Sequence, residues 1–429
     1  MTIYKTSRTK NPIILAVTFF LSATIYNVSA FAADSVVLTF STVGDSREEP
    51  EEIDPSRKNA AMVGVGNCQK AAGATGLVPN PGLSGQDCKW LQNSTAWSRI
   101  MREIQGQKAN LLFFNGDMIM GYGKTNVPVT RNKTGVSEVA IANPTITDIL
   151  NSDIMQHYTQ YAFWRGMIAN LMETGTYVVP VPGNHETQCK RCIDNNKNNK
   201  ISQVENENAW RDNMGDLIPD ISRFTKLVGS APENMSSTFP GVTDGIATSQ
   251  AQLSYSFDVG QSHFVVINTD AVGKDGYAPT NWLEDDLTKA DARGVKRIFV
   301  FGHKPATYYE FVGTPAAKST DSLNNNNTVA AQAFWTVIDN HKATYFCGHE
   351  HIYNVSQPFG KTAYQVMVGS GGSPFDAQPN SNFTASDRLY AWATVKIYKS
   401  GKVQMETWGF DTTMTGSLIK IASIELPTK

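Results

Sequence analysis

Long apolar runs and clusters of basic residues are both scarce in this sequence. Beyond one N-terminal segment, no stretch approaches the roughly 20 consecutive apolar residues that a membrane-spanning helix requires. Lysine and arginine form no run after the first ten positions, and the formal net charge is −2. We therefore expect no membrane span, and the lack of a basic field argues against a nucleic-acid polymer as a partner.

Cysteine is also rare, with five residues in the chain. Cys68 and Cys88 flank a loop rich in glycine and proline, which a disulfide between them would close. Cys189 and Cys192 form a CxxC pair that is either a short disulfide or half of a metal site, and the absence of a second CxxC favours the disulfide. Cys347 has no activating neighbour in the sequence, so we expect a buried free thiol there.

The N-terminal segment differs from the rest of the chain. Basic residues within the first ten positions precede an apolar run at 13–25, and small residues follow at Ala30 and Ala32. This arrangement is typical of a secretory signal peptide, which we expect over residues 1–33. The mature chain, residues 34–429, would then be exported and be either secreted or periplasmic. An oxidising compartment of this kind permits disulfides.

Short runs rich in β-branched and aromatic residues alternate with longer helical patterns, which favours an α/β fold built in layers. Predicted strands cover 36–42, 110–114, 177–181, 253–258, 263–268, 297–301, 343–346, 362–368, 390–398 and 402–408. Predicted helices cover 95–107, 147–173, 280–292 and 329–340. Long segments near 50–92, 124–143 and 187–250 indicate insertions in a single domain, and such loops often shape the rim of an active site.

Metal-binding side chains follow five of these strands at their carboxyl ends. The motifs are TFSTVGD ending at Asp45, LLFFNGD ending at Asp117, VVPVPGNHE with Asn184 and His185, IFVFGH ending at His303, and YFCGHEH with His349 and His351. Carboxyl ends of strands in an open α/β sheet share an edge, so these residues can converge from distant positions. Carboxylates, an amide oxygen and imidazoles together suit zinc, manganese or iron. Six ligands exceed the need of one ion, which predicts two ions that share a carboxylate.

The ordered series GD, GD, GNHE, GH and GHxH, from Gly44 to His351, resembles the calcineurin-like metallophosphoesterases and, among them, the purple acid phosphatase branch. The resemblance implies an α/β fold, a four-layer α/β/β/α sandwich with long loop insertions. It also implies hydrolysis of a small phosphate ester by a metal-bound hydroxide at a pair of metal ions.

The resemblance assigns a role to each residue of the series. It places Asp45 and His351 on the first ion, Asp117 between the two ions, and Asn184, His303 and His349 on the second ion. His185 would face the substrate and protonate the leaving group, with Glu186 nearby as an orienting carboxylate. General acid–base catalysis of this kind is typically worth about 10²–10⁴ in rate.

Two positions depart from the family pattern. Arg47 stands where most of the wider family carries a histidine, two residues after the first aspartate. Met120 stands where the purple branch has a tyrosine ligand, and Tyr122 lies two residues further on. The first metal site is therefore expected to be weak, filled by water, or completed by Tyr122. Arg47 has two open roles, which are to grip a phosphate oxygen or to pair with Glu48 or Glu49.

The loop after GNHE carries a second motif, DNNKNNKISQVE, which matches an EF-hand-type calcium loop. The candidate calcium ligands are Asp194, Asn196, Asn198, Lys200, Ser202 and Glu205. Asn199 replaces the usual glycine at the sixth position, and asparagine tolerates the left-handed backbone better than most residues. Weak calcium binding and a flexible asparagine-rich loop are both consistent with this motif.

The sequence thus predicts an exported dinuclear phosphoesterase acting on phosphate monoesters, with Fe, Mn or Zn at its centre and calcium as an additional ion. The alternatives are a phosphodiesterase of the same fold, a non-catalytic exported binding protein with a degenerate first metal site, and a calcium-dependent adhesion module. Outside the motif series, His157, His263 and His341 are assigned to packing or the surface, and Lys304 to solvent.

Overall fold

A computed structural model describes residues 34–47, 85–124, 129–131, 138–150, 152–190, 192, 200–236, 244–309, 321–373, 375, 388–411 and 416–429. Residues 35–429 form one compact unit. The predicted signal peptide at 1–33, the Cys68 partner of Cys88, and the first half of the predicted calcium loop lie outside the described residues.

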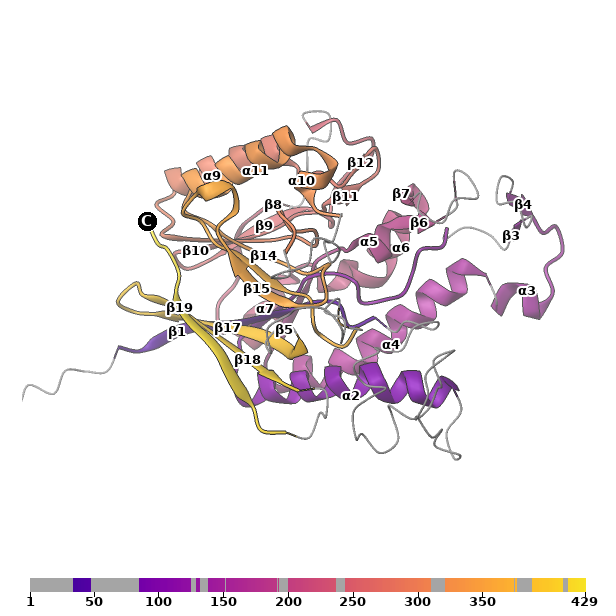
Figure 1. Cartoon of the computed structure of the whole chain (residues 1–429), viewed down its shortest axis with the longest axis horizontal. Coiled ribbons are helices and arrows are strands. Elements are labelled where there is room, and N and C mark those ends of the chain that lie inside the picture. The colour runs from indigo at the N-terminus through magenta and orange to yellow at the C-terminus, as the bar shows by residue number, and fades with distance from the viewer. Residues whose placement is uncertain are drawn as a thin grey trace, which may run out of the picture. The chain divides into compact units, whose positions relative to one another are not determined.

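Two β-sheets form the centre of the described unit (Figure 1). In spatial order the first sheet comprises β19 (Ile419–Glu425), β18 (Val403–Phe410), β17 (Tyr390–Tyr398), β1 (Val36–Val43), β2 (Leu111–Phe114) and β5 (Tyr177–Pro180). The second sheet comprises β15 (Tyr353–Ser356), β16 (Gln365–Val368), β14 (Thr344–Cys347), β13 (Arg297–Phe301), β10 (Ser262–Val266), β9 (Tyr255–Val259) and β8 (Glu233–Ser236). Strands β1, β2 and β5 are parallel to one another, as are β10, β13, β14 and β16.

Helices cover the outer face of each sheet, so the fold has four layers (Figure 1). The first sheet is covered by α2 (Gly85–Gly106), α4 (Asp153–Thr174) and α6 (Val204–Met214), and the second by α9 (Thr280–Ala292) and α11 (Thr328–Asn340). The shorter helices are α3 (Ile146–Leu150), α5 (Asn184–Thr187), α7 (Ile221–Val228) and α10 (Leu323–Asn326). Short paired strands are β3 (Val129–Arg131) with β4 (Glu138–Ala140), β6 (Gln188–Lys190) with β7 (Lys200–Ser202), and β11 (Asp270–Ala271) with β12 (Lys274–Asp275). The predicted α/β/β/α sandwich is confirmed.

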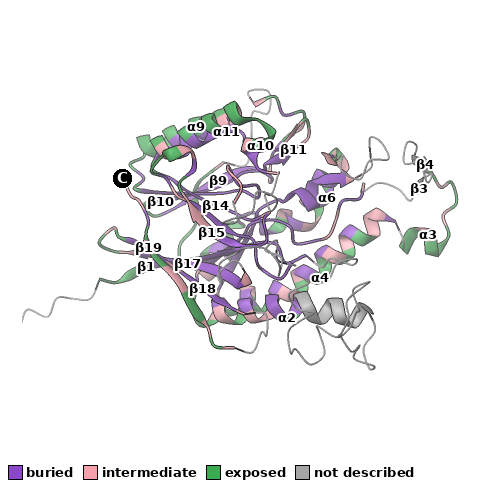
Figure 2. Ribbon diagram, in the orientation of Figure 1, coloured by how far each residue is buried: buried purple, intermediate pink, exposed green. Residues whose placement is uncertain are grey.

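Alternation along the strands explains this layering, because successive side chains point to opposite faces of a sheet. In β13, Phe299 and Phe301 join the core between the two sheets, while Ile298 and Val300 pack toward the α9 and α11 layer. The Phe301 ring stacks on Phe113 of the opposite sheet with centroids 3.8 Å apart. Such aromatic pairs contribute about 0.5–1.5 kcal/mol beyond their buried area. Figure 2 shows the result, with buried strands inside and exposed outer faces on the helices.

The predicted elements agree with the structure at most strands and differ at some helices. The helix predicted over 147–173 is divided, because Ser152 caps a new helix by accepting a hydrogen bond from the Met155 backbone N–H. Helix α2 begins at Gly85, ten residues before the predicted start. The segment 187–250, predicted as an insertion loop, contains α6 and α7 among its described residues.

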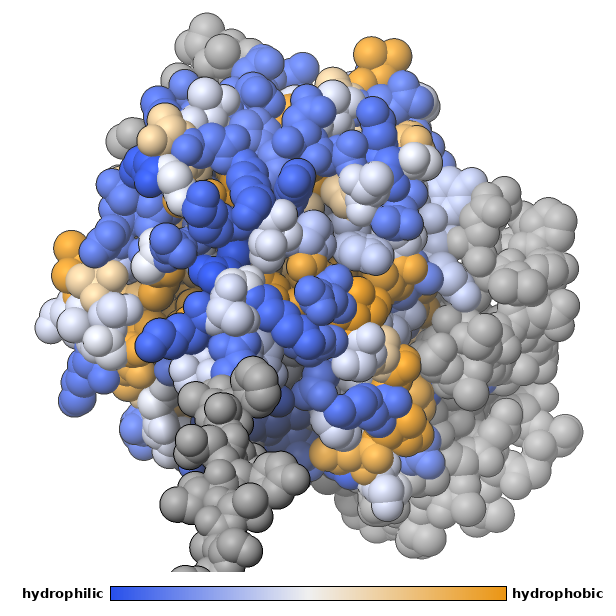
Figure 3. Space-filling view, turned by 90° about the vertical axis from the view of Figure 1, so that its left-hand side faces the viewer, coloured by the Kyte–Doolittle hydropathy of each residue, from blue (hydrophilic) through white to orange (hydrophobic). Residues whose placement is uncertain are grey.

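The face of the molecule drawn in Figure 3 is mainly polar. Hydrophilic residues predominate on it, and apolar residues form smaller patches. Among the described helices, none combines the length and the apolar character that a membrane span requires.

Candidate metal centre

The predicted ligands lie just beyond the carboxyl ends of their strands, as the sequence indicates. Asp45 follows β1, Asp117 follows β2, and His349 follows β14, each in a left-handed backbone conformation with φ of 60°, 56° and 74°. Non-glycine residues rarely adopt this conformation, and such strain is concentrated at functional sites. The chain therefore bends sharply at each ligand.

Glycine is required next to these ligands because the loops approach one another closely. A Cβ atom at Gly116 would lie 2.5 Å from His303 Nδ1, and one at Gly348 would lie 2.3 Å from Asp45 Oδ2. Contacts this short are not tolerated, so the glycines in the GD and GH motifs have a steric reason.

Four ligand atoms converge in one pocket, which we call the histidine pocket (Asp117, Asn184, His303 and His349). Nε2 of His303 lies 2.8 Å from Oδ1 of Asn184, 3.1 Å from Oδ1 of Asp117 and 3.1 Å from Nδ1 of His349. Nδ1 of His349 lies 2.9 Å from the same Asn184 oxygen. Ligands around tetrahedral zinc are spaced by about 3.3 Å, given zinc–nitrogen bonds of about 2.0–2.1 Å. The donor set and its spacing fit a divalent metal ion.

His303 is oriented so that Nε2 faces this pocket. Its Nδ1 lies 2.7 Å from the Asn115 carbonyl oxygen, to which it donates a hydrogen bond, leaving Nε2 as the metal-facing nitrogen. Burial alone would lower the pKa of His303, but the charge and hydrogen bond of Asp117 raise it to about 9. The field of the pocket therefore favours a positive charge at this place.

His349 is held by residues outside the motif series. Its Nε2 lies 3.4 Å from Oδ2 of Asp321, which leaves Nδ1 directed at the pocket. Asp321 also pairs with Lys304 at 2.8 Å, and Lys304 pairs with Asp270 at 2.9 Å. Asp321 and Asp270 belong to no motif of the sequence and were not predicted. The prediction that Lys304 faces solvent is wrong, because its side chain is buried; burial lowers its pKa, but Asp270 and Asp321 raise it overall.

A second group of ligands, the arginine pocket (Asp45, Arg47 and His351), lies on the other side of Asp117. Nη1 of Arg47 lies 2.7 Å from Nε2 of His351 and 2.9 Å from Oδ2 of Asp117. Oδ1 of Asp45 lies 3.6 Å from both Arg47 Nη1 and His351 Nε2. Glu48 and Glu49, the predicted alternative partners of Arg47, lie outside the described residues.

The carboxylates of the two pockets have opposite electrostatic surroundings. Burial raises the pKa of Asp45 well above its usual range. Burial acts in the same direction on Asp117, but the charges of His185, His303 and Arg47 hold the pKa of that carboxyl well below its usual range. Asp117 is thus the carboxylate most firmly kept in its charged form, as expected for a residue between two cationic sites.

His185 and Glu186 lie beside the centre in α5. His185 Nε2 is 3.5 Å from Oδ2 of Asp117, and its Nδ1 is 2.5 Å from the carbonyl oxygen of Met120. The Glu186 carboxylate accepts hydrogen bonds from the backbone N–H groups of Asp117, Met118, Ile119 and Gly183. Glu186 therefore fixes the loop that carries Asp117, while the Met120 carbonyl orients the His185 ring.

The sequence model of the calcineurin-like phosphoesterase family matches residues 90–353 of this chain. The chain belongs to this family. The matched segment contains Asp117 and the ligands Asn184, His303, His349 and His351, whereas Asp45 and Arg47 precede it. This is a family of phosphoesterases, which implies hydrolysis of phosphate esters with divalent metal ions at this centre.

Solved phosphatases show distant likeness to the whole chain. A purple acid phosphatase from yellow lupin (Lupinus luteus) seeds is 12% identical with a TM-score of 0.48, and the comparison covers 91% of this chain and 54% of the lupin chain. This chain thus spans about half the length of that protein. A dimetal phosphatase from Danio rerio is 13% identical with a TM-score of 0.45, covering 91% of this chain and 99% of the other. No curated protein matches the sequence.

Tyr122 of this calcineurin-like phosphoesterase lies against the histidine pocket. Its hydroxyl accepts a hydrogen bond from the Asn184 amide. Burial, reinforced by the negative charge of Asp117, raises the pKa of Tyr122 well above its usual value. The tyrosine therefore supports Asn184 as a neutral phenol, and completion of the first site by Tyr122 stays a prediction.

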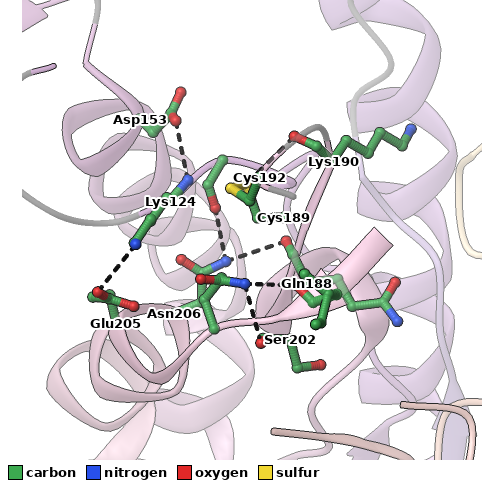
Figure 4. The surroundings of a disulfide bond; sticks show 12 residues. Lys124, Asp153, Gln188, Cys189, Lys190, Cys192, Ser202, Glu205 and Asn206 are labelled. Carbon is green, nitrogen blue, oxygen red and sulfur yellow. Dashed lines mark hydrogen bonds and ion pairs between the residues drawn. A yellow bond between two sulfur atoms is a disulfide. The ribbon is translucent and has the colours of Figure 1, made fainter. Parts of the chain in front are cut away.

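The CxxC pair of the phosphoesterase is a disulfide, as predicted (Figure 4). Cys189 forms an isolated β-bridge with Tyr122. The Lys190 backbone N–H donates to the Tyr122 carbonyl oxygen at 3.0 Å, and Lys190 Nζ lies 3.8 Å from the centre of the Tyr122 ring. Cys347 is a buried free thiol, also as predicted, and burial raises its pKa.

The described half of the predicted calcium loop has other contacts. Ser202 Oγ donates to the Asp270 carbonyl oxygen at 2.6 Å, and its backbone N–H donates to Asp275 at 2.7 Å. Glu205 lies 3.5 Å from Lys124 Nζ (Figure 4), and Lys200 Nζ lies 3.8 Å from Asp321 Oδ2. Asp194, Asn196 and Asn198 lie outside the described residues. Calcium binding remains a prediction from the motif.

His263 is part of a buried charge cluster away from the motif series. Its Nδ1 lies 2.5 Å from Asp258 and its Nε2 lies 2.8 Å from Asp286, while Arg293 pairs with Asp258 at 2.9 Å. Burial opposes protonation, but the two carboxylates raise the pKa of His263. The assignment of His263 to packing omitted these partners, which the sequence does not reveal.

Proposed function

We propose that this chain is an exported phosphatase that hydrolyses phosphate monoesters at the metal centre described above. The observation that carries the proposal is the convergence of His303 Nε2, His349 Nδ1 and Asn184 Oδ1, with separations of 2.8–3.1 Å, beside Asp117 and His185. This donor set suits Mn²⁺, Fe²⁺ or Zn²⁺. The sequence series GD, GD, GNHE, GH and GHxH predicts two such ions.

Bound metal ions in this class of site activate a water molecule and neutralise charge on the phosphoryl oxygens. The side chains divide the remaining tasks. Burial and the Arg47 charge lower the pKa of His185, so the negative charge of a bound phosphate ester is needed to keep this histidine protonated. His185, held by the Met120 carbonyl, then protonates the leaving oxygen. Arg47 places a permanent positive charge next to Asp117, where a phosphoryl oxygen can accept a charge-assisted hydrogen bond.

A preference for monoesters follows from this charge arrangement. A phosphate monoester carries one more terminal oxygen and up to one more negative charge than a diester. The Arg47 guanidinium gives the centre a cation in addition to any metal ion, which favours the more highly charged substrate. The alternative is a phosphodiesterase of the same fold. Such an enzyme would recognise its substrate by the leaving group instead of by the extra negative charge.

Hydrolysis of para-nitrophenyl phosphate and its bis-ester tests the function. The full chain is stripped of metal, reconstituted in turn with Mn²⁺, Fe²⁺ and Zn²⁺, and compared with His303→Ala and the control His341→Gln. We expect metal-dependent turnover that is faster with the monoester, lost in His303→Ala and retained in the control, because His341 pairs with Asp291 instead of a ligand. Faster turnover of the bis-ester would favour the diesterase.

Export is supported by the N-terminal sequence and by the Cys189–Cys192 disulfide, which an oxidising compartment stabilises. N-terminal sequencing of the protein recovered from the culture medium or periplasm tests this part. We expect a start at residue 33 or 34. Recovery of the intact N-terminus from the cytoplasm would contradict it.

A non-catalytic binding protein is the second candidate, and the presence of Arg47 between Asp117 and His351 is the observation that favours it. That protein would bind phosphate esters without turnover in any divalent ion. The proposed phosphatase predicts turnover that depends on His185, so the same hydrolysis assay with His185→Ala separates the two.

A further inference from the structure

Asp117 presents one carboxylate oxygen to each pocket. Oδ1 lies 3.1 Å from His303 Nε2 in the histidine pocket, and Oδ2 lies 2.9 Å from Arg47 Nη1 in the arginine pocket. In a dinuclear centre, a bridging carboxylate offers its oxygens to two ions in this way. The guanidinium nitrogen thus takes the place relative to Asp117 that a second ion would take.

Arg47 Nη1 also donates a hydrogen bond to the lone pair of His351 Nε2. A guanidinium has only donors and no acceptor, so Nε2 of His351, 2.7 Å from Arg47 Nη1, must be the acceptor. This lone pair is the one that a metal ion would need. A metal ion bonds to nitrogen and oxygen ligands at about 2.0–2.2 Å, so it cannot share this space with the Arg47 nitrogen.

In the described structure, His303, His349 and Asn184 of the histidine pocket pair with no lysine or arginine. Its two imidazole nitrogens and the Asn184 oxygen face one another at 2.8–3.1 Å. The nearby Lys304 pairs with Asp270 and Asp321, and Lys200 Nζ lies 3.8 Å from Asp321. The two pockets therefore differ in what neutralises their carboxylates. One requires an ion, and the other holds an arginine.

We propose that the centre binds a single divalent metal ion, in the histidine pocket, and that the Arg47 guanidinium replaces the second ion. This inference rests on the proposed function, because the single ion is assigned to the hydrolysis of phosphate esters. It changes the expected centre from dinuclear to mononuclear. A guanidinium cannot exchange or be chelated, and its planar donors match phosphoryl oxygens geometrically. The arginine would therefore hold the substrate while the ion activates water.

The test is metal stoichiometry, measured by elemental analysis after saturation with Mn²⁺ and exhaustive dialysis. We expect one equivalent per chain in the wild type and none in His303→Ala. Arg47→His, which restores the histidine of the wider family, is expected to bind two equivalents. Arg165→His is the matched control and is expected to bind one, because Arg165 pairs with the exposed Asp216.

A wild-type measurement protects the test against a variant that fails to fold. Electron paramagnetic resonance of the Mn²⁺-loaded wild type is expected to show an isolated ion without exchange coupling. Two equivalents with a coupled spectrum would overturn the mononuclear inference, and turnover in the same sample would leave the proposed function standing. No bound metal and no turnover in the wild type would overturn both.

Discussion

The two pockets on either side of Asp117 both lie at the carboxyl ends of strands, and β14 contributes a histidine to each, but they are neutralised differently. The histidine pocket brings two imidazoles and an amide oxygen to within 2.8–3.1 Å of one another. In the arginine pocket, Arg47 Nη1 stands 2.7 Å from His351 and 2.9 Å from Asp117. In the mononuclear proposal, a single arginine at a ligand position lowers the number of ions that the centre needs, although the ligands of the motif series are all present.

Removing a histidine from each pocket provides the strongest contrast. His303→Ala is expected to lower turnover of nitrophenyl phosphate by on the order of 10³–10⁴, because a metal ion supplies several kcal/mol of transition-state stabilisation. His351→Ala is expected to lower it by about 10–100, as for a residue that orients another group. Both variants are assayed with saturating Mn²⁺, together with their metal content. Equal losses of activity, each with one ion fewer, would make the two pockets equivalent.

The leaving-group side of the centre is tested by His185→Gln. His185 lies 3.5 Å from Asp117 and close to both pockets. If it protonates the leaving oxygen, turnover of phenyl phosphate should fall by about 10²–10³, and turnover of nitrophenyl phosphate, whose leaving group needs little protonation, should fall less. Comparing kcat for the two esters checks this. An equal loss with both would assign His185 a positioning role.

Asp321 contacts a ligand of the histidine pocket, His349, from outside the pocket. Asp321→Asn weakens the contact to His349 Nε2, seen at 3.4 Å, and is expected to reduce Mn²⁺ affinity by about 10-fold or more. Competition with a chelator measures the affinity. The control is Asp212→Asn, whose carboxylate only accepts a hydrogen bond from Tyr158 in the described structure. Matching affinities for the two variants would remove Asp321 from the metal site.

His263 provides a histidine cluster with no metal role, and its effect should appear in stability alone. The raised pKa of His263 means that its ion pairs contribute fully below the unfolded-state pKa of about 6.5 and are lost as pH rises through the folded-state value. His263→Gln should therefore lower the free energy of unfolding by about 3 kcal/mol near pH 5.5, and by less at pH 9.

Denaturant unfolding at both pH values measures this difference, with turnover near neutral pH as the accompanying readout. Asp258, whose pKa is lowered by its partners against the effect of burial, contributes above about pH 4. The window between roughly pH 4 and 6.5 is thus where the cluster is strongest. A deficit that grows toward pH 9 would contradict the assigned charges.

Sequence patterns predicted the layers and the ligands because both depend on local order. Strand β13 and helix α9 lie at their predicted bounds, since apolar alternation and helical periodicity are short-range signals. Helices α6 and α7 were missed in an insertion whose composition is polar. Their structure depends on packing, with Trp210 and Phe224 fully buried.

The contacts that support the metal centre could not be predicted from the sequence, for a different reason. Arg47 and His351 are 304 positions apart, and Asn184 and His349 are 165 apart. The motif series indicated that these residues meet, but it carried no information about which nitrogen faces which oxygen. Asp321, which orients His349, belongs to no motif, and only the folded chain reveals it.

The most direct test of the account is anomalous X-ray scattering from crystals of the wild type grown with Mn²⁺. We expect one anomalous peak among His303 Nε2, His349 Nδ1 and the Asn184 oxygen, with the Arg47 guanidinium between Asp117 and His351. A second peak between Asp45 and His351, with Arg47 displaced, would contradict it.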